Sequence, residues 1–74
     1  MSGSPTNWVI GDGDMVSIGD HVALDLDLDR DAIGRIVDVC GDHTGRPLVE
    51  VTEGRRSGQR LAVWPAQMLL RVRR

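Results

Sequence analysis

Residues 64–72 read Trp-Pro-Ala-Gln-Met-Leu-Leu-Arg-Val, and the predicted architecture follows outward from this stretch. Proline lacks the backbone N–H that a β-ladder needs, so Pro65 ends the strand before it. The three residues after Pro65 suit a single turn of 3₁₀-helix. An apolar run then resumes at Leu69, which predicts a last strand over residues 69–73.

A half-buried strand with an acidic outer face is predicted over residues 22–28. Apolar and polar residues alternate there with a period of two, as they do when one face of a strand is buried. The aspartates that would share the solvent face are Asp25, Asp27 and Asp29. Residues 29–31 are expected to turn the chain toward the next strand.

Three further strands are predicted before Pro65. Residues 33–39 are rich in β-branched side chains and contain Gly34, which suits a bulge or a bend. The remaining segments are a turn-rich loop at 41–47, a strand at 48–52, a hairpin connection at 53–58 and a strand at 59–64.

Two short motifs in this pattern resemble small barrels of the Src-homology-3 type. Ile-Gly-Asp-His-Val at 18–22, followed by Ile-Gly-Arg-Ile-Val at 33–37, resembles the start of KOW-like and Tudor-like barrels, where a Gly-Asp turn precedes the first strand. Residues 63–70 are similar to the hydrophobic-Pro-x-x-hydrophobic-Leu ending of Src-homology-3 domains. The resemblance covers roughly residues 16–73. It implies an all-β fold, a small five-stranded Src-homology-3-like barrel with a short 3₁₀ turn before the last strand, but no particular function.

A chain of 74 residues is long enough for one domain. We expect the barrel to occupy residues 15–74 and residues 1–14 to form a flexible N-terminal arm, because Ser, Gly, Pro, Asn and Asp dominate that segment. Cys40 is the single cysteine, which favours a reducing compartment, the cytoplasm. No apolar run approaches the roughly 20 residues that a membrane span needs, so no membrane partner is expected.

The formal net charge of −2 conceals a bipolar distribution along the chain. Residues 1–37 hold seven aspartates and two arginines, for a net charge of −5, whereas residues 38–74 hold four acidic residues and seven arginines, for +3. The absence of lysine fits a GC-rich bacterial genome. Such a separation of charge influences which charged partners the chain attracts.

Five arginines are candidate binding residues. Arg55, Arg56 and Arg60 crowd one predicted hairpin, and Arg71 and Arg73 belong to a basic C-terminal tail that could lie on the same side. Such a cluster can track a phosphate backbone. The isoelectric point near 5.5 and the lack of aromatic residues between the arginines oppose this interpretation.

Trp64 is a further candidate for contacting a partner. Src-homology-3 and Tudor domains bind polyproline and methylated cations with several aromatic side chains. This chain has two tryptophans and no Tyr or Phe, so both ligand classes are disfavoured. The competing interpretation is that Trp64 is a rim residue stacked on Pro65.

No catalytic residue, metal site or cofactor is predicted. The aspartates of residues 25–31 are spaced like calcium ligands, but Arg30 and Ile36 stand where an EF-hand needs its glycine and its glutamate. Cys40 and His43 supply too few ligands for structural zinc. No nucleophile or phosphate-binding motif is present, so we expect neither enzymatic activity nor a small-molecule substrate.

Two functions are consistent with these features. The first is a non-catalytic protein-interaction or assembly module, in which the acidic strand face of one copy meets the basic hairpin of another copy or the module docks onto a larger complex. The alternative is a KOW-like barrel that contacts nucleic-acid phosphates through the arginine hairpin and the C-terminal tail. The negative net charge favours a protein partner or self-association.

Overall fold

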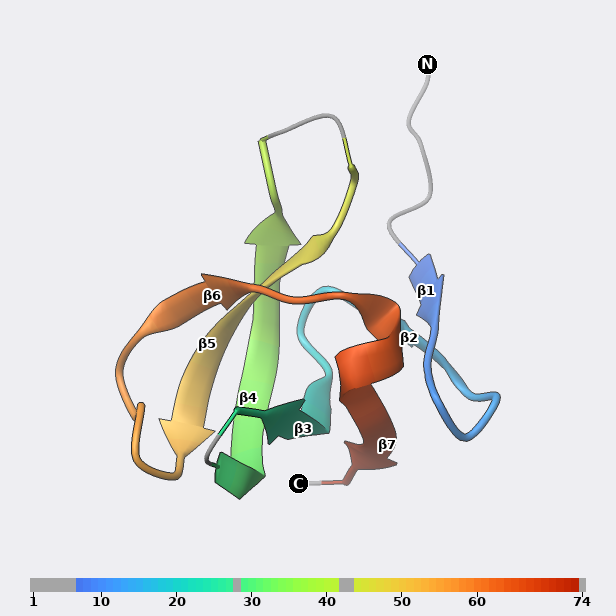
Figure 1. Cartoon of the computed structure of the whole chain (residues 1–74). Coiled ribbons are helices and arrows are strands. Elements are labelled where there is room, and N and C mark those ends of the chain that lie inside the picture. The colour runs from blue at the N-terminus through green and yellow to red at the C-terminus, as the bar shows by residue number, and fades with distance from the viewer. Residues whose placement is uncertain (1–6, 28, 42–43, 74) are drawn as a thin grey trace.

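The computed structural model describes residues 7–27, 29–41 and 44–73, and these form a mostly β chain (Figure 1). The predicted all-β class is confirmed. In chain order the elements are β1 (Asn7–Val9), β2 (Met15–Ser17), β3 (His21–Leu26), β4 (Asp29–Val39), β5 (Pro47–Glu53), β6 (Arg60–Ala62), the 3₁₀-helix η1 (Pro65–Gln67) and β7 (Met68–Val72).

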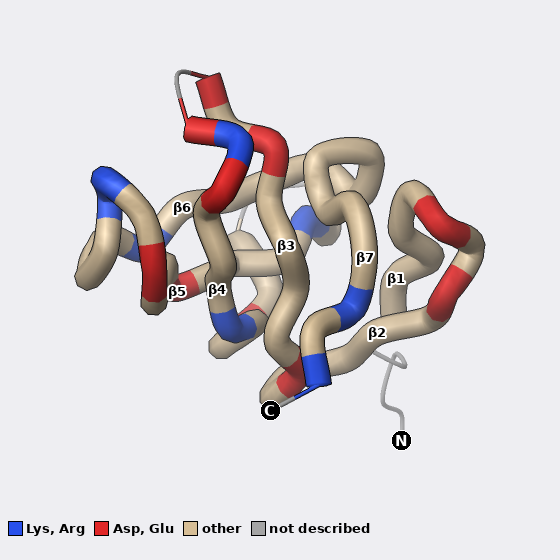
Figure 2. The backbone as a smooth tube through the Cα atoms, turned by 90° about the horizontal axis from the view of Figure 1, so that it is seen from below, with Lys and Arg blue, Asp and Glu red and all other residues tan. Residues whose placement is uncertain are grey.

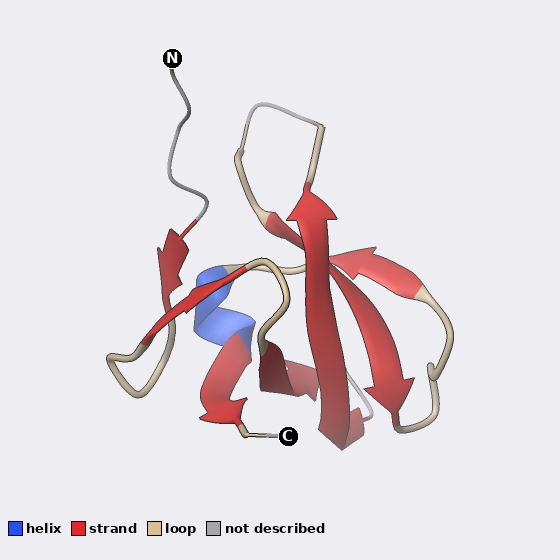
Figure 3. Cartoon of the chain, turned by 180° about the vertical axis from the view of Figure 1, so that it is seen from behind, coloured by secondary structure: helices blue, strands red, loops and turns tan. Residues whose placement is uncertain are grey.

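Five of these strands form one antiparallel sheet in the order β6-β5-β4-β3-β7 (Figure 3). Strands β3 to β6 follow one another as hairpins, and β7 returns to pair with β3. Strands β6 and β7 are therefore the two edges. Among the described residues no pairing joins these edges, so the closed barrel expected from the sequence is not seen.

The alternation in β3 buries one face of this sheet. Val22, Leu24 and Leu26 are at most 4% exposed, whereas Asp25 between them is exposed. The side chains that pack with them come from the other strands and from both ends of the chain. The buried apolar residues are Ile10, Val16, Val22, Leu24, Leu26, Ala32, Ile36, Val49, Val51, Val63 and Met68.

Gly34 lies at an irregularity in the long strand β4. The register of β4 against β5 shifts between Ile33 and Gly34, which agrees with the bulge or bend expected there. A Cβ atom at residue 34 would meet Cγ1 of Val49 and lie 3.0 Å from Cδ1 of Leu24. Glycine is needed here because neighbouring side chains fill the space that its own would take.

The segment predicted as a flexible arm contributes to the fold from residue 7 onward. Strand β1 pairs with β2, so the expected boundary between residues 14 and 15 falls inside this hairpin. Ile10 is 4% exposed and belongs to the core. The indole Nε1–H of Trp8 donates a hydrogen bond to the carbonyl of Gly45, at 2.9 Å. Residues 1–6 lie outside the described residues.

The turn expected at residues 29–31 is displaced toward the N-terminus. Leu26 at the end of β3 pairs with Asp29, so Asp29 already belongs to β4 and the chain reverses before it. The Asp29 carboxylate accepts a hydrogen bond from the backbone N–H of Arg55, at 2.8 Å. The turn prediction was wrong because Asp29 pairs with Leu26 in the β-ladder, so the connection is shorter and earlier than expected.

Pro65 performs the role that the sequence predicts. Helix η1 begins at Pro65 itself, one residue earlier than expected, and β7 follows it directly. The Gln67 side chain accepts a hydrogen bond from the Trp64 N–H at 2.9 Å, and the Gln67 N–H donates to the Trp64 carbonyl at 2.8 Å. These two bonds fix the short turn that leads into the edge strand.

Candidate interaction surface on strand β7

Strand β7 exposes two consecutive leucines at the edge of the sheet. Leu70 pairs with Ala23 and Met68 pairs with Leu24, so Leu69 has no partner of its own on β3. This β-bulge breaks the alternation of the strand: Met68 is fully buried, whereas Leu69 is 39% and Leu70 47% exposed. Bulges re-aim side chains in this way and are common beside functional sites.

Leu70 belongs to an apolar row that crosses three strands. Its partner on β3 is Ala23, and Ala23 pairs with Ile33 on β4. Cross-strand partners share one face of a sheet, and this is the face turned away from the buried Leu24. Ala23 and Ile33 are half-buried. The exposed leucines therefore continue into a partly apolar outer face.

The next row of the same face is polar. Val72 on β7 pairs with His21, and His21 pairs with Arg35 on β4. The register continues through Glu50 to Arg60, so one row crosses all five strands. Nε of Arg60 lies 3.2 Å from Oε1 of Glu50, which forms an ion pair at the far edge. Arg35 is exposed in the middle of this row.

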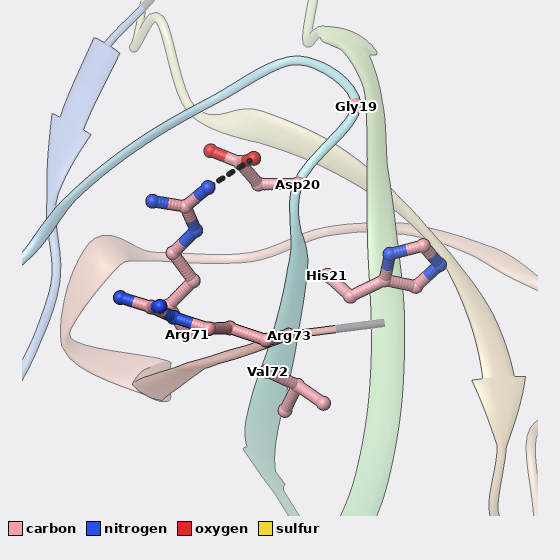
Figure 4. A pocket seen from close by; sticks show the side chains of 6 residues that line it. All are labelled: Gly19, Asp20, His21, Arg71, Val72 and Arg73. Atoms are coloured by element: carbon pink, nitrogen blue, oxygen red, sulfur yellow. Dashed lines mark ion pairs between the residues drawn. The ribbon is translucent and has the colours of Figure 1, made fainter.

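A pocket of about 160 Å³ lies at the end of β7 (Figure 4). Figure 4 shows the side chains of Asp20, Arg71 and Arg73 on one side of β3 and that of His21 on the other. Nη2 of Arg71 lies 3.4 Å from Oδ1 of Asp20. Gly19 and Val72 complete the lining. Two arginines against one aspartate give the pocket a net positive charge.

A tight turn at residues 17–20 positions the Asp20 carboxylate. The Asp20 N–H donates to the Ser17 carbonyl at 3.1 Å, and the Ser17 N–H donates to Oδ2 of Asp20 at 2.9 Å. Gly19 has a φ angle of 101°, in the left-handed region that favours glycine. Because the backbone holds this carboxylate, Arg71 meets a fixed acceptor and its guanidinium is kept at the pocket wall.

The five candidate arginines fall into two separate groups. Arg71 lies on β7 with Arg73 just after it, whereas Arg55 and Arg56 lie in the β5–β6 connection and Arg60 begins β6. Strands β6 and β7 stand at opposite ends of the strand order. Figure 2 shows the basic segments of the β5–β6 connection away from those beside the C-terminus. Along the backbone the five arginines therefore fall into two groups, one at each edge strand.

The three candidate aspartates do not share one strand face. Asp25 is exposed on β3, Asp27 is exposed in the turn, and Asp29 is half-buried as the first residue of β4. The bond from the Arg55 N–H to Asp29 places the arginine hairpin beside the acidic turn of the same chain. The acidic strand face and the basic hairpin that the sequence assigns to two different copies are therefore neighbours within one copy.

Trp64 is exposed, but its ring is in contact with the guanidinium of Arg46. Half of its surface is accessible, and Cζ of Arg46 lies 4.5 Å from the centre of its ring. A guanidinium over an indole face at this distance is a cation–π contact. Trp64 does not line the β7 pocket. Together with the Trp8 bond to Gly45, this contact anchors the loop between β4 and β5.

Sequence reasoning selected Arg71 and Arg73 but missed the groups around them. The sequence predicts a strand over Leu69 and Leu70 but does not indicate that both are exposed, because their exposure comes from the bulge against β3. Asp20 and His21 served only as a fold motif. Arg35 joins His21 through strand register alone, which sequence spacing does not reveal.

Within residues 7–27, 29–41 and 44–73, no three His, Cys, Asp or Glu side chains are grouped so that they could hold a metal ion. No helix in that part of the chain has the length and apolar character required to cross a membrane. No family model matches the sequence, and the comparisons with curated proteins and with solved structures also give no match.

Proposed function

We propose that the chain is a non-catalytic protein-interaction module that binds its partner through the β7 surface, comprising Leu69, Leu70, Arg71, Val72 and Arg73. The supporting observation is the β-bulge that exposes Leu69 and Leu70 beside a pocket lined by two arginines. An apolar centre with a polar rim is the usual anatomy of a protein–protein interface, and arginine is enriched in such interfaces.

We also propose that the sheet belongs to a small barrel of the Src-homology-3 type. The order β6-β5-β4-β3-β7 and the 3₁₀ turn before the last strand support this assignment. In such a barrel the sheet curls until its two edge strands approach. Amide-to-amide nuclear Overhauser contacts between the β6 and β7 edges test the proposal, and a sheet whose edges give no such contacts contradicts it.

The alternative, binding to nucleic-acid phosphates, has weaker support. Its five arginines lie in two groups, and carboxylates engage Arg60 and Arg71 within the chain. A phosphate backbone would have to displace these partners or contact only one group. The arrangement therefore favours a protein partner.

Affinity capture with paired variants tests the proposed function. The protein is immobilised, and the polypeptides that it retains from an extract of its own source cells are identified. Leu69→Ser combined with Leu70→Ser removes the apolar centre of the β7 surface. Val9→Ser combined with Met15→Ser is the matched control, because Val9 and Met15 are cross-strand partners, each 59% exposed, on the β1–β2 hairpin.

We expect the wild type and the hairpin control to retain the same partner and the leucine variant to lose it. Circular dichroism and thermal unfolding establish that all three proteins are folded. Equal retention by the leucine variant and the wild type would show that the β7 surface is not the binding site.

A further inference from the structure

We propose that the partner of the β7 surface is a second copy of this chain, which presents its acidic turn to the arginines beside β7. The inference rests on the proposed function and names its partner. The acidic turn is defined as Asp25, Asp27, Asp29 and Asp31. The basic end is defined as Arg35, Arg71 and Arg73, which lie at the same end of the β3 ladders, Arg35 in the row of His21 and the other two on the opposite side of β3. Copies joined in this way associate head to tail.

The two charged groups lie at opposite ends of the β3–β4 ladder. His21 pairs with Arg35 at one end, and Leu26 pairs with Asp29 at the other. Five residue steps of about 3.3 Å separate His21 from Leu26, a distance of about 16 Å. Figure 2 shows the acidic segments of the turn at one end of β3 and the basic segments beside the C-terminus at the other end. The turn of one copy therefore meets the basic end of another copy and not its own.

The acidic turn offers carboxylates that its own chain does not use. Asp25, Asp27 and Asp31 are exposed, and within the described residues no side chain forms an ion pair with them. Asp29 is engaged by the Arg55 N–H, and Arg30 contributes one positive charge to the turn. On the neighbouring hairpin, Arg55 follows Gly54 beside Asp29, and Glu53 pairs with Ile33 on β4. The carboxylates at the tip of the turn remain available.

The basic end offers the complementary donors. Arg35 and Arg73 are exposed and have no ion-pair partner among the described residues. Arg71 is held by Asp20, which leaves its remaining N–H groups at the wall of the 160 Å³ pocket. Asp20 is the one carboxylate in the pocket, so positive charge prevails there. Arginine is suited to binding carboxylates because its guanidinium presents paired donors.

A symmetric pairing of two β7 strands is disfavoured by the same residues. The Gly11 N–H donates to the Met68 carbonyl at 2.9 Å, so the β1–β2 hairpin already occupies the start of the β7 edge. The rest of that edge carries Arg71 and Arg73, and two antiparallel copies would place these positive charges against each other. Like charges opposite one another destabilise paired strands. The remaining mode of association joins two different surfaces of the chain, and repeated contacts of this kind generate rings or open chains.

Sedimentation velocity tests this proposal with two variants, each of which is weakened at one of the two contact surfaces. Arg35→Gln combined with Arg73→Gln weakens the basic end and leaves the Asp20–Arg71 pair intact. Asp25→Asn combined with Asp27→Asn weakens the acidic turn. Arg55→Gln combined with Arg56→Gln is the control, because it removes the same positive charge from the hairpin beside the acidic turn and leaves the basic end unchanged. Each protein is run from micromolar to millimolar concentration, at about 20 mM and about 500 mM salt.

We expect the wild type and the hairpin control to associate with rising concentration at low salt and to return to monomers at high salt. The variant with the weakened basic end and the variant with the weakened acidic turn each stay monomeric when studied alone. Their equimolar mixture forms a dimer and nothing larger, because the intact turn of one binds the intact basic end of the other. A wild type that is monomeric at every concentration would overturn the proposal, and so would a mixture that behaves like its separate components.

The outcome separates this inference from the proposed function. If the wild type is monomeric but the leucine variant still loses a different captured protein, the interaction module stands and the second copy is not its partner. If head-to-tail association is present but capture does not depend on Leu69 and Leu70, the inference stands and the apolar centre is not the binding site.

Discussion

Oδ2 of Asp29 lies 2.8 Å from the backbone nitrogen of Arg55 and accepts its hydrogen bond, although 26 residues separate the two. Gly54 makes the approach possible. Its φ angle is 118°, and a Cβ atom there would come within 2.5 Å of the Asp29 carboxylate. The contact ties the start of β4 to the hairpin after β5, and it brings the acidic turn and the arginine hairpin together in one molecule.

Asp29→Ala should lower the free energy of unfolding by about 0.5–1.5 kcal/mol, because the Arg55 N–H loses its acceptor. Urea denaturation followed by circular dichroism measures the change. Asp25→Ala removes the same charge from an exposed position that has no hydrogen-bond partner among the described residues, and it should change stability by less than about 0.5 kcal/mol. Equal effects of the two substitutions would mean that the Asp29 contact does not stabilise the protein.

Ile10→Ala tests whether residues 7–14 belong to the folded domain. Ile10 is 4% exposed within the core, so its truncation should destabilise the protein by about 2–5 kcal/mol. Val9, its neighbour in the sequence, is 59% exposed, and Val9→Ala should cost less than about 0.5 kcal/mol. Thermal unfolding distinguishes the two. A negligible effect of Ile10→Ala would show that the segment is a free arm.

Met68→Ala and Leu69→Ala together test the bulge in β7. Met68 is fully buried and its truncation should cost about 2–5 kcal/mol, whereas the partly exposed Leu69 should cost about 1 kcal/mol. Chemical denaturation of both variants gives the comparison. If Leu69→Ala proved the more destabilising change, the register of β7 would be shifted by one residue.

Gly34→Ala should destabilise the protein by about 1–3 kcal/mol, because the added methyl group would overlap the Val49 side chain and crowd Leu24. Gly41→Ala is the control, since nothing lies within 4 Å of a Cβ atom at that position. Both are compared by urea denaturation. A Gly34→Ala variant as stable as the Gly41→Ala variant would place the β4 bulge elsewhere.

Fluorescence anisotropy with labelled DNA and RNA, single-stranded and duplex, tests the nucleic-acid alternative. At about 50 mM salt a protein making several phosphate contacts binds orders of magnitude more tightly than at about 200 mM. We expect no such salt-sensitive binding, because carboxylates of the same chain engage Arg60 and Arg71 and the acidic turn lies beside the Arg55 backbone. Tight binding at the lower salt that is lost in Arg71→Glu combined with Arg73→Glu would make β7 a nucleic-acid site.

Local periodicity was enough to predict most of the strands. The alternation over residues 22–26 reports one buried and one exposed face. Pro65 has a fixed φ angle and no N–H to donate, so it ends the strand before it. The Gly34 bulge was also readable, because a glycine inside a β-branched run has few other uses. Such features depend on residues close together in the chain, so their order in the sequence carries the information.

The candidate interaction surface depends on contacts between segments distant in the chain. Leu69 is exposed because β7 gains a residue against β3, and Arg35 joins His21 and Val72 because three strands align in one register. Ile10 is buried because the β1–β2 hairpin closes over the core, and the Asp29 carboxylate is engaged because the β5–β6 connection brings the Arg55 N–H to it. The same local sequence pattern is compatible with many alternative registers and long-range contacts, and the tertiary structure contains one of them. Local sequence therefore specifies the strands and their buried faces, whereas register and long-range hydrogen bonds establish which side chains meet.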